Sequence, residues 1–173
     1  MLTEALRVID QMHRDGVISK YAIGGAVGAI FYLEPIDTVD VDIFVVLPSI
    51  AGGQVLSLSE IYEYLLPRGY ATKGEYIVVD DWPIQFLPAT TELELEALNA
   101  AVPIDAEGVP TWVMTAEHLV AICLKTGRAK DYARIVQFME QAEALDMTKL
   151  QNILARHGLS EKWHLFAKRF LNE

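Results

Sequence analysis

The segment 39–47 constrains the fold more than any other part of the sequence, because it predicts a β-strand at the centre of a sheet. Most of its residues are β-branched or otherwise apolar, and Pro48 ends it. From Ile43 onward the segment is apolar on both faces, which is typical of a strand covered on both sides. Its only polar members are Asp40 and Asp42, and alternate residues of a strand point to the same face. The sequence therefore predicts a central strand with two carboxylates side by side near one end.

The spacing of these two aspartates suits a metal ion. Alternate α-carbons of a strand lie about 6.6–7 Å apart, so two carboxylates can converge on one Mg²⁺. Mg²⁺ takes oxygen ligands and commonly combines one or two carboxylates with waters and substrate phosphates. The alternative is a strand with one solvated face. Buried acids are costly unless they are paired or bound to a metal, and this favours metal ligation by Asp40 and Asp42.

Two adjacent glycines, Gly24 and Gly25, separate a predicted strand at 21–23 from a predicted helix at 26–32. Glycines allow the backbone to approach a ligand closely, and the start of a helix offers free N–H groups to a phosphate. The alternative is an ordinary tight turn, because the pattern matches neither a dinucleotide-binding loop nor a Walker loop. The aspartates that follow favour a nucleoside triphosphate site.

The order of the elements predicts an α+β fold. An N-terminal helix, the strands above, a helix at 59–66, another at 92–101 and two hairpins occupy residues 1–112. The hairpins are predicted at 76–87 and 102–113. After Thr115, four helices follow without a Pro-rich or Ser-rich linker. We therefore expect an α/β lobe over 1–112 and a helical lobe over 113–173 packed against it.

Composition excludes several classes of protein. The chain has 173 residues, of which 52% are hydrophobic, and its formal net charge is −10. The acidic balance argues against binding to long nucleic acid, which needs a basic face. A single cysteine, Cys123, excludes an intramolecular disulfide. The sequence shows no basic segment ahead of an apolar core at its start and no apolar run of about 20 residues, so we expect a cytoplasmic protein without membrane contact.

The glycine and aspartate motifs together resemble those of a known superfamily. Ile23-Gly24-Gly25, Phe31-Tyr32, Pro35 and Thr38-Val39-Asp40-Val41-Asp42-Ile43 resemble the nucleotidyltransferase fold, the relatives of DNA polymerase beta. They look most like a small bacterial branch related to abortive-infection type IV toxins. The resemblance implies transfer of a nucleoside monophosphate to a hydroxyl with release of pyrophosphate. It further implies Mg²⁺ on Asp40 and Asp42, and the nucleotide on Gly24, Gly25 and Thr38.

The second half of the chain adds basic residues to this resemblance. Residues 119–125, followed by 127–131, are similar to the helical segment of such proteins. Lys125, Arg128 and Lys130 are then implied as contacts to the triphosphate or nucleotide. The alternative is that these charges are solvated at helix ends.

One departure from the superfamily concerns the chemistry. The superfamily usually supplies a third carboxylate from a later strand, and the matching stretch 82–87 places Gln85 there. An amide oxygen can bind Mg²⁺, but it cannot act as a general base. Either Asp40 and Asp42 suffice, or another acid such as Glu75 substitutes, or activity is lost. A second departure is Ile36 after Pro35, where many members have arginine.

Gln85 also sustains a rival hypothesis of a different class. The chain could be a catalytically inactive nucleotide-binding or protein-interaction module that kept the fold, or a component of a toxin–antitoxin pair. The acceptor, the base preference and the oligomeric state do not follow from the sequence. A protein partner or a second copy of the chain is compatible with it.

Overall fold

The structure is a computed structural model that describes residues 2–34, 38, 40–47, 57–141, 143 and 145–171. Within this part, seven strands form one mixed sheet in the order β3-β4-β5-β2-β1-β7-β6. The strands are β1 (Lys20–Ile23), β2 (Val41–Val46), β3 (Ala71–Lys73), β4 (Tyr76–Val79), β5 (Trp82–Pro88), β6 (Val102–Ala106) and β7 (Val109–Val113). The predicted central strand is confirmed, because β2 lies between β5 and β1.

The pairing of β2 sets up the site. It runs antiparallel to β1, with Ile43 opposite Ile23, and parallel to β5, with Asp42 beside Gln85. The strands β4 and β5 form the first predicted hairpin, and β6 and β7 form the second. Strand β3 is an addition to the predicted elements. All three of its residues are exposed, so it lacks the apolar alternation by which a strand is recognised and depends on its pairing with β4.

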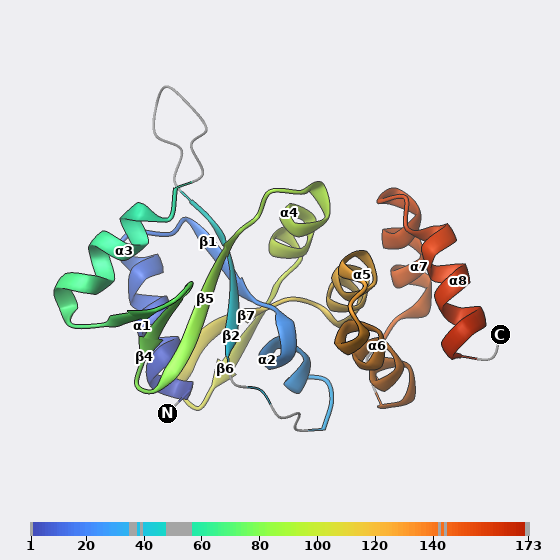
Figure 1. Ribbon diagram of the computed structural model, residues 1–173, viewed down its shortest axis with the longest axis horizontal. Coiled ribbons are helices and arrows are strands. Elements are labelled where there is room, and N and C mark those ends of the chain that lie inside the picture. Colours follow the sequence, from blue (N-terminus) through green and yellow to red (C-terminus); the bar gives the residue numbers. More distant parts are fainter. Residues whose placement is uncertain are drawn as a thin grey trace.

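The helices are α1 (Leu2–Arg14), α2 (Gly25–Ile30), α3 (Ser59–Leu65), α4 (Glu92–Asn99), α5 (Ala116–Thr126), α6 (Ala129–Gln141), α7 (Met147–Arg156) and α8 (Ser160–Phe170), with a short 3₁₀ turn at Leu66–Arg68. Figure 1 shows α5 to α8 gathered on one side of the molecule, with α2 and α4 between them and the sheet. Helices α1 and α3 lie at the other side. The mixed sheet with flanking helices and a C-terminal helical group is the predicted fold class.

The sheet packs against two separate apolar cores. One contains the inward face of α1 with Ile43 and Ile84 of the central strands. The other contains Phe44, buried residues of α4, and buried residues of all four C-terminal helices, such as Phe138 and Phe166. The division into lobes at residues 112 and 113 remains a prediction. It falls near the end of β7, and the second core crosses it.

Several local predictions are resolved as well. Thr115, after which the helices were predicted, caps α5, because its side chain accepts a hydrogen bond from the His118 N–H. Residues 35–37, 39 and 51–53 lie outside the described residues. No helix in the described part of the chain has the length and apolar character needed to span a membrane.

Candidate active site

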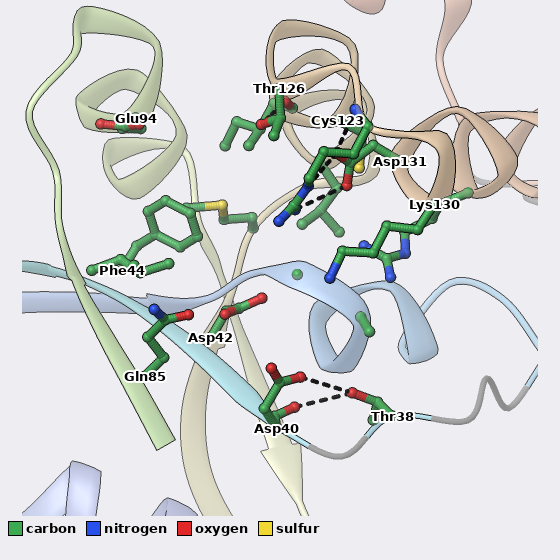
Figure 2. Close-up of a pocket in the computed structure, with 18 of the residues that line it drawn as sticks. Thr38, Asp40, Asp42, Phe44, Gln85, Glu94, Cys123, Thr126, Lys130 and Asp131 are labelled. Atoms are coloured by element: carbon green, nitrogen blue, oxygen red, sulfur yellow. Dashed lines mark hydrogen bonds and ion pairs between the residues drawn. The ribbon is translucent and has the colours of Figure 1, made fainter. Parts of the chain in front are cut away.

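A cavity of about 1040 Å³ lies between one face of the sheet and the helices α5 and α6. Strands β2 and β5 form its floor, and the start of α2 and the turn between β3 and β4 lie at its edges. Figure 2 shows Asp40, Asp42 and Gln85 on the floor, with Lys130 across the cavity from them. Five of the site residues predicted in the first half of the chain line this cavity: Gly25, Thr38, Asp40, Asp42 and Gln85. The sixth, Gly24, adjoins it.

The two aspartates share the cavity face because they are alternate residues at the start of β2. Asp40 precedes the strand, and the Thr38 hydroxyl lies 3.1 Å from its main-chain oxygen and 3.3 Å from its Oδ1. Burial raises the pKa of Asp42, and the negative charge of Asp40 raises it further. Lys130, Arg134 and Arg128 act in the opposite direction. The pair therefore forms a concentrated negative charge that a cation would stabilise.

The glycine turn lies directly against this pair. The Gly24 N–H donates a 2.9 Å hydrogen bond to the main-chain oxygen of Asp42. Gly25 has a φ of 56°, and a Cβ placed on it would lie 1.9 Å from Asp42 Oδ2. Only glycine fits this position, for reasons both of conformation and of space. The aspartates and the glycine turn thus face each other across one site, as the sequence predicts.

Gln85 completes the floor beside Asp42 on β5. In the described part of the chain, no group of three or more His, Cys, Asp or Glu side chains is arranged to hold a metal ion. The cavity floor instead offers two carboxylates and one amide. All are oxygen donors, which suits a hard cation such as Mg²⁺ better than a softer metal.

The opposite wall of the cavity is basic. Arg128, just before α6, is held in a two-bond ion pair by the buried Asp131, with Nε–Oδ2 at 2.7 Å and Nη2–Oδ1 at 3.1 Å. Lys130 and Arg134 are one helical turn apart, so they project from the same face of α6. Arg134 Nε is buried and has no hydrogen-bond partner among the described residues. Lys130, Arg134 and Arg128 face the aspartates electrostatically, because each of them lowers the pKa of Asp42.

No family model matches the sequence, and a search of the curated proteins finds no match. Solved structures do match. An antigenic nucleotidyltransferase-like protein from Paracoccidioides brasiliensis superposes with a TM-score of 0.52 at 15% identity, over 91% of this chain and 89% of that one. ANT(2″)-Ia in complex with adenylyl-2″-tobramycin superposes with a TM-score of 0.54 at 12% identity, over 96% and 98%. The fold is that of nucleotidyltransferase-like proteins. The narrower resemblance to abortive-infection toxins stays a prediction.

Within this nucleotidyltransferase-like fold, the three basic residues singled out from the sequence do not all lie at the cavity. Arg128 and Lys130 line the cavity, but Lys125 does not. The face of α5 that lines the cavity carries Leu119, Ile122, Cys123 and Thr126. Lys125 lies roughly 100° around the helix from its neighbour Thr126, and its side chain is exposed. Its main-chain oxygen accepts a hydrogen bond from Lys162 Nζ at 2.9 Å, which ties the end of α5 to α8.

Sequence reasoning missed two cavity residues on α6, Arg134 and Gln137. The signal that could have found them is the spacing from Lys130, because residues four and seven positions later share one face of a helix. Glu75 and Tyr76 also line the cavity, at the turn between β3 and β4. Glu75 was named only as a substitute for the third carboxylate, and Tyr76 was not singled out.

Proposed function

We propose that the chain is a Mg²⁺-dependent nucleotidyltransferase. It binds a nucleoside triphosphate and transfers the nucleoside monophosphate to an acceptor hydroxyl, with release of pyrophosphate. The observation that carries the proposal is the pairing, in one cavity, of the Asp40 and Asp42 carboxylates with a facing basic wall. The structural likeness to nucleotidyltransferase-like proteins supports it.

Asp40 and Asp42 are proposed to hold the metal ion, with the Gln85 amide oxygen as a weaker neutral ligand. Burial is the main cause of the raised pKa of Asp42, and the negative charge of Asp40 adds to it; a divalent cation would relieve both. When bound, the ion would neutralise negative charge on the phosphates as the bond is exchanged. Because Gln85 replaces a carboxylate, this set of donors fits one ion better than two.

The triphosphate is proposed to lie between the glycine turn and α6. The Gly24 N–H is occupied by Asp42, so the contact to phosphate falls to the N–H groups of Gly25 and Ala26. Lys130 and Arg134 supply positive charge from the opposite wall, in the role that the sequence suggested for Lys125. Arg128 is already paired with Asp131, so it would contribute less positive charge to the phosphates than Lys130 and Arg134.

The proposed acceptor is a small compound with a hydroxyl group, whose binding does not require a large charged surface on the protein. ANT(2″)-Ia was solved with an adenylylated tobramycin, a nucleotide joined to its acceptor. A cavity of about 1040 Å³ is large enough here for a nucleotide and part of a second molecule. An acidic chain with a confined basic wall suits a small acceptor better than long nucleic acid.

Two measurements test the proposal. Thermal unfolding is followed with ATP, GTP, CTP or UTP, each with and without Mg²⁺, and stabilisation should require both components. Pyrophosphate release is then followed with a panel of acceptor alcohols and with water. Asp40→Asn and Asp42→Asn should abolish both effects. If the wild-type protein shows no Mg²⁺-dependent nucleotide binding, the proposal is wrong.

Gln85 supports a second candidate, an inactive nucleotide-binding module of the same fold. Such a module would be stabilised by Mg²⁺ and a triphosphate but would release no pyrophosphate with any acceptor. A role in a toxin–antitoxin pair is compatible with either candidate. Expression of the wild-type and Asp42→Asn chains, with growth as the readout, tests it.

A further inference from the structure

Nucleotidyl transfer to a hydroxyl requires a group that takes the hydroxyl proton. Gln85 occupies the place beside Asp42 where such a group is expected, and an amide cannot accept a proton at neutral pH. Asp40 and Asp42 are committed to the metal in the proposed function. Another residue of the cavity must therefore act as the base. Without one, the protein would bind the nucleotide but would not transfer it.

The sheet register points to the turn between β3 and β4. Asp42 and Gln85 are neighbours on β2 and β5, and Ile77 on β4 pairs with Ile84 on β5. One position further in that antiparallel register, Tyr76 lies beside Gln85. The residues Asp42, Gln85 and Tyr76 thus form a row across three strands, and all three line the cavity. Glu75 precedes Tyr76, lines the same cavity and is exposed to solvent.

The surroundings of Tyr76 link Glu75 electrostatically to the aspartate pair. Desolvation raises the pKa of the Tyr76 hydroxyl, and the negative charges of Asp40, Glu75 and Asp42 raise it further. The Tyr76 hydroxyl therefore stays protonated and is itself no base, but it can donate a hydrogen bond. Glu75 is the carboxylate next to this hydroxyl.

The other proton acceptors of the cavity are engaged or unsuitable. The Asp131 carboxylate is bound on both oxygens by Arg128. Glu94 caps α4, and its Oε2 accepts the N–H groups of Thr90 and Thr91 at 2.8 and 3.0 Å. Figure 2 shows Glu94 away from Asp42 and Gln85, with Phe44 between them. Burial raises the pKa of the Cys123 thiol to about 11, so it is no base at neutral pH.

We propose that Glu75 is the general base of the transfer, placed by the turn between β3 and β4 on the far side of Gln85 from Asp42. The inference rests on the proposed function. The acceptor oxygen forms a new bond to the α-phosphorus, and its proton passes to the Glu75 carboxylate. The bond from the α-phosphorus to the bridging oxygen breaks, and pyrophosphate leaves with that electron pair.

The test separates binding from turnover in Glu75→Gln. Loss of a general base lowers rates by roughly 100-fold to 10,000-fold. We expect a loss of turnover in this range, while the Kd for Mg²⁺ with a non-hydrolysable triphosphate changes by less than about twofold. Because Glu75 is exposed, the variant should fold normally. In Glu75→Ala, added formate should restore part of the turnover by accepting the proton in place of the missing carboxylate.

Two variants serve as comparisons. Glu63→Gln removes an exposed glutamate that does not line the cavity, and it should behave as wild type. Glu94→Gln tests the rival base while keeping a residue type that can form the same helix cap. Three results would overturn this inference but not the proposed function. They are wild-type turnover in Glu75→Gln, a loss of nucleotide affinity in Glu75→Gln equal to its loss of turnover, and a loss of turnover in Glu94→Gln alone. Absence of Mg²⁺-dependent binding or turnover in the wild type would overturn the proposed function with it.

Discussion

At the scale of single residues, Asp42 leaves no room for a side chain at position 25. Alanine at position 25 would place its Cβ 1.9 Å from Asp42 Oδ2 and would have to adopt a positive φ of 56°. We expect Gly25→Ala to lower the free energy of unfolding by about 2–5 kcal/mol and to abolish nucleotide binding. Chemical denaturation and titration with a Mg²⁺–triphosphate measure the two effects.

The matched control is Gly158→Ala. Gly158 has a φ of 67°, but a Cβ there would meet nothing within 4 Å. It should therefore show only the conformational cost, about 1–2 kcal/mol, with nucleotide binding intact. Equal losses of stability in the two variants would show that the contact with Asp42 is relaxed in solution.

The aspartate pair leads to a trade-off between stability and function. A carboxylate with a raised pKa favours folding most when it is protonated, and this contribution is lost as the pH rises from 3.8 through the raised value. At pH 7 and without metal, Asp42→Asn should therefore melt at a higher temperature than wild type. The same variant should lose the stabilisation by Mg²⁺ and nucleotide. A lower melting temperature for Asp42→Asn in a metal-free buffer would contradict the cost of burying the charged Asp42 carboxylate beside Asp40.

The residues that sequence reasoning placed correctly are those whose position follows from local rules. Strand alternation puts Asp40 and Asp42 on one face, and the junction between strand and helix puts Gly24 and Gly25 beside them. Gln85 followed from its place on the adjacent strand in the family pattern. The sequence pattern could not place Lys125 outside the cavity lining, because its direction depends on the rotation of α5 against the sheet, which is set by tertiary packing.

At the scale of elements, the helices α4, α5 and α7 meet at a polar network around Glu96. Glu96 accepts hydrogen bonds from Arg156, at the end of α7, and interacts with His118 on α5 and with His157. Arg156 is the main cause of the low pKa of Glu96, about 2, and His157 and His118 lower it further. Burial lowers the pKa of His118, so this ring favours the neutral form. The network joins α4, which follows β5, to the helices after β7.

This network predicts a specific acid sensitivity. A carboxylate with a lowered pKa contributes stability above its unfolded value, and that contribution is lost as the pH falls from 4.5 through about 2. Glu96→Gln should therefore destabilise the protein by about 1–3 kcal/mol at pH 7, and the difference from wild type should shrink below pH 4.5. Denaturation at several pH values measures it. Glu92→Gln, an exposed change on the same helix, should show no comparable loss.

Elements with a strong sequence signal were predicted well, and elements made by pairing were not. The apolar stripes of α1 and α7 and the turn residues of both hairpins identify those elements from local sequence alone. Strand β3 has three exposed residues and exists because Ala71, Thr72 and Lys73 pair with β4. The turn before β4 places Glu75 at the cavity beside Tyr76, the first residue of β4, so sequence reasoning named Glu75 only as an alternative acid and did not single out Tyr76.

At the scale of the whole molecule, the cavity is bounded by the sheet on one side and by α5 and α6 on the other, and one apolar core extends beneath both. Phe138 on α6 is fully buried in that core, and its ring lies 6.3 Å from the ring of Tyr32, which follows α2. Residues on both sides of the predicted lobe boundary therefore stabilise each other. We expect the sheet and the C-terminal helices to unfold together in one transition.

Calorimetry of the intact chain tests this coupling. Phe138→Ala should lower the free energy of unfolding by about 3–5 kcal/mol and the Tm of the single transition by about 6–20 °C. Phe170→Ala, at a ring that is 38% exposed, should cost much less. Saturating Mg²⁺ and nucleotide should raise the Tm of the whole transition, because a ligand held between β2 and α6 binds only when both are folded. Two separate transitions, with only one shifted by Phe138→Ala, would show that the helices fold as an independent unit.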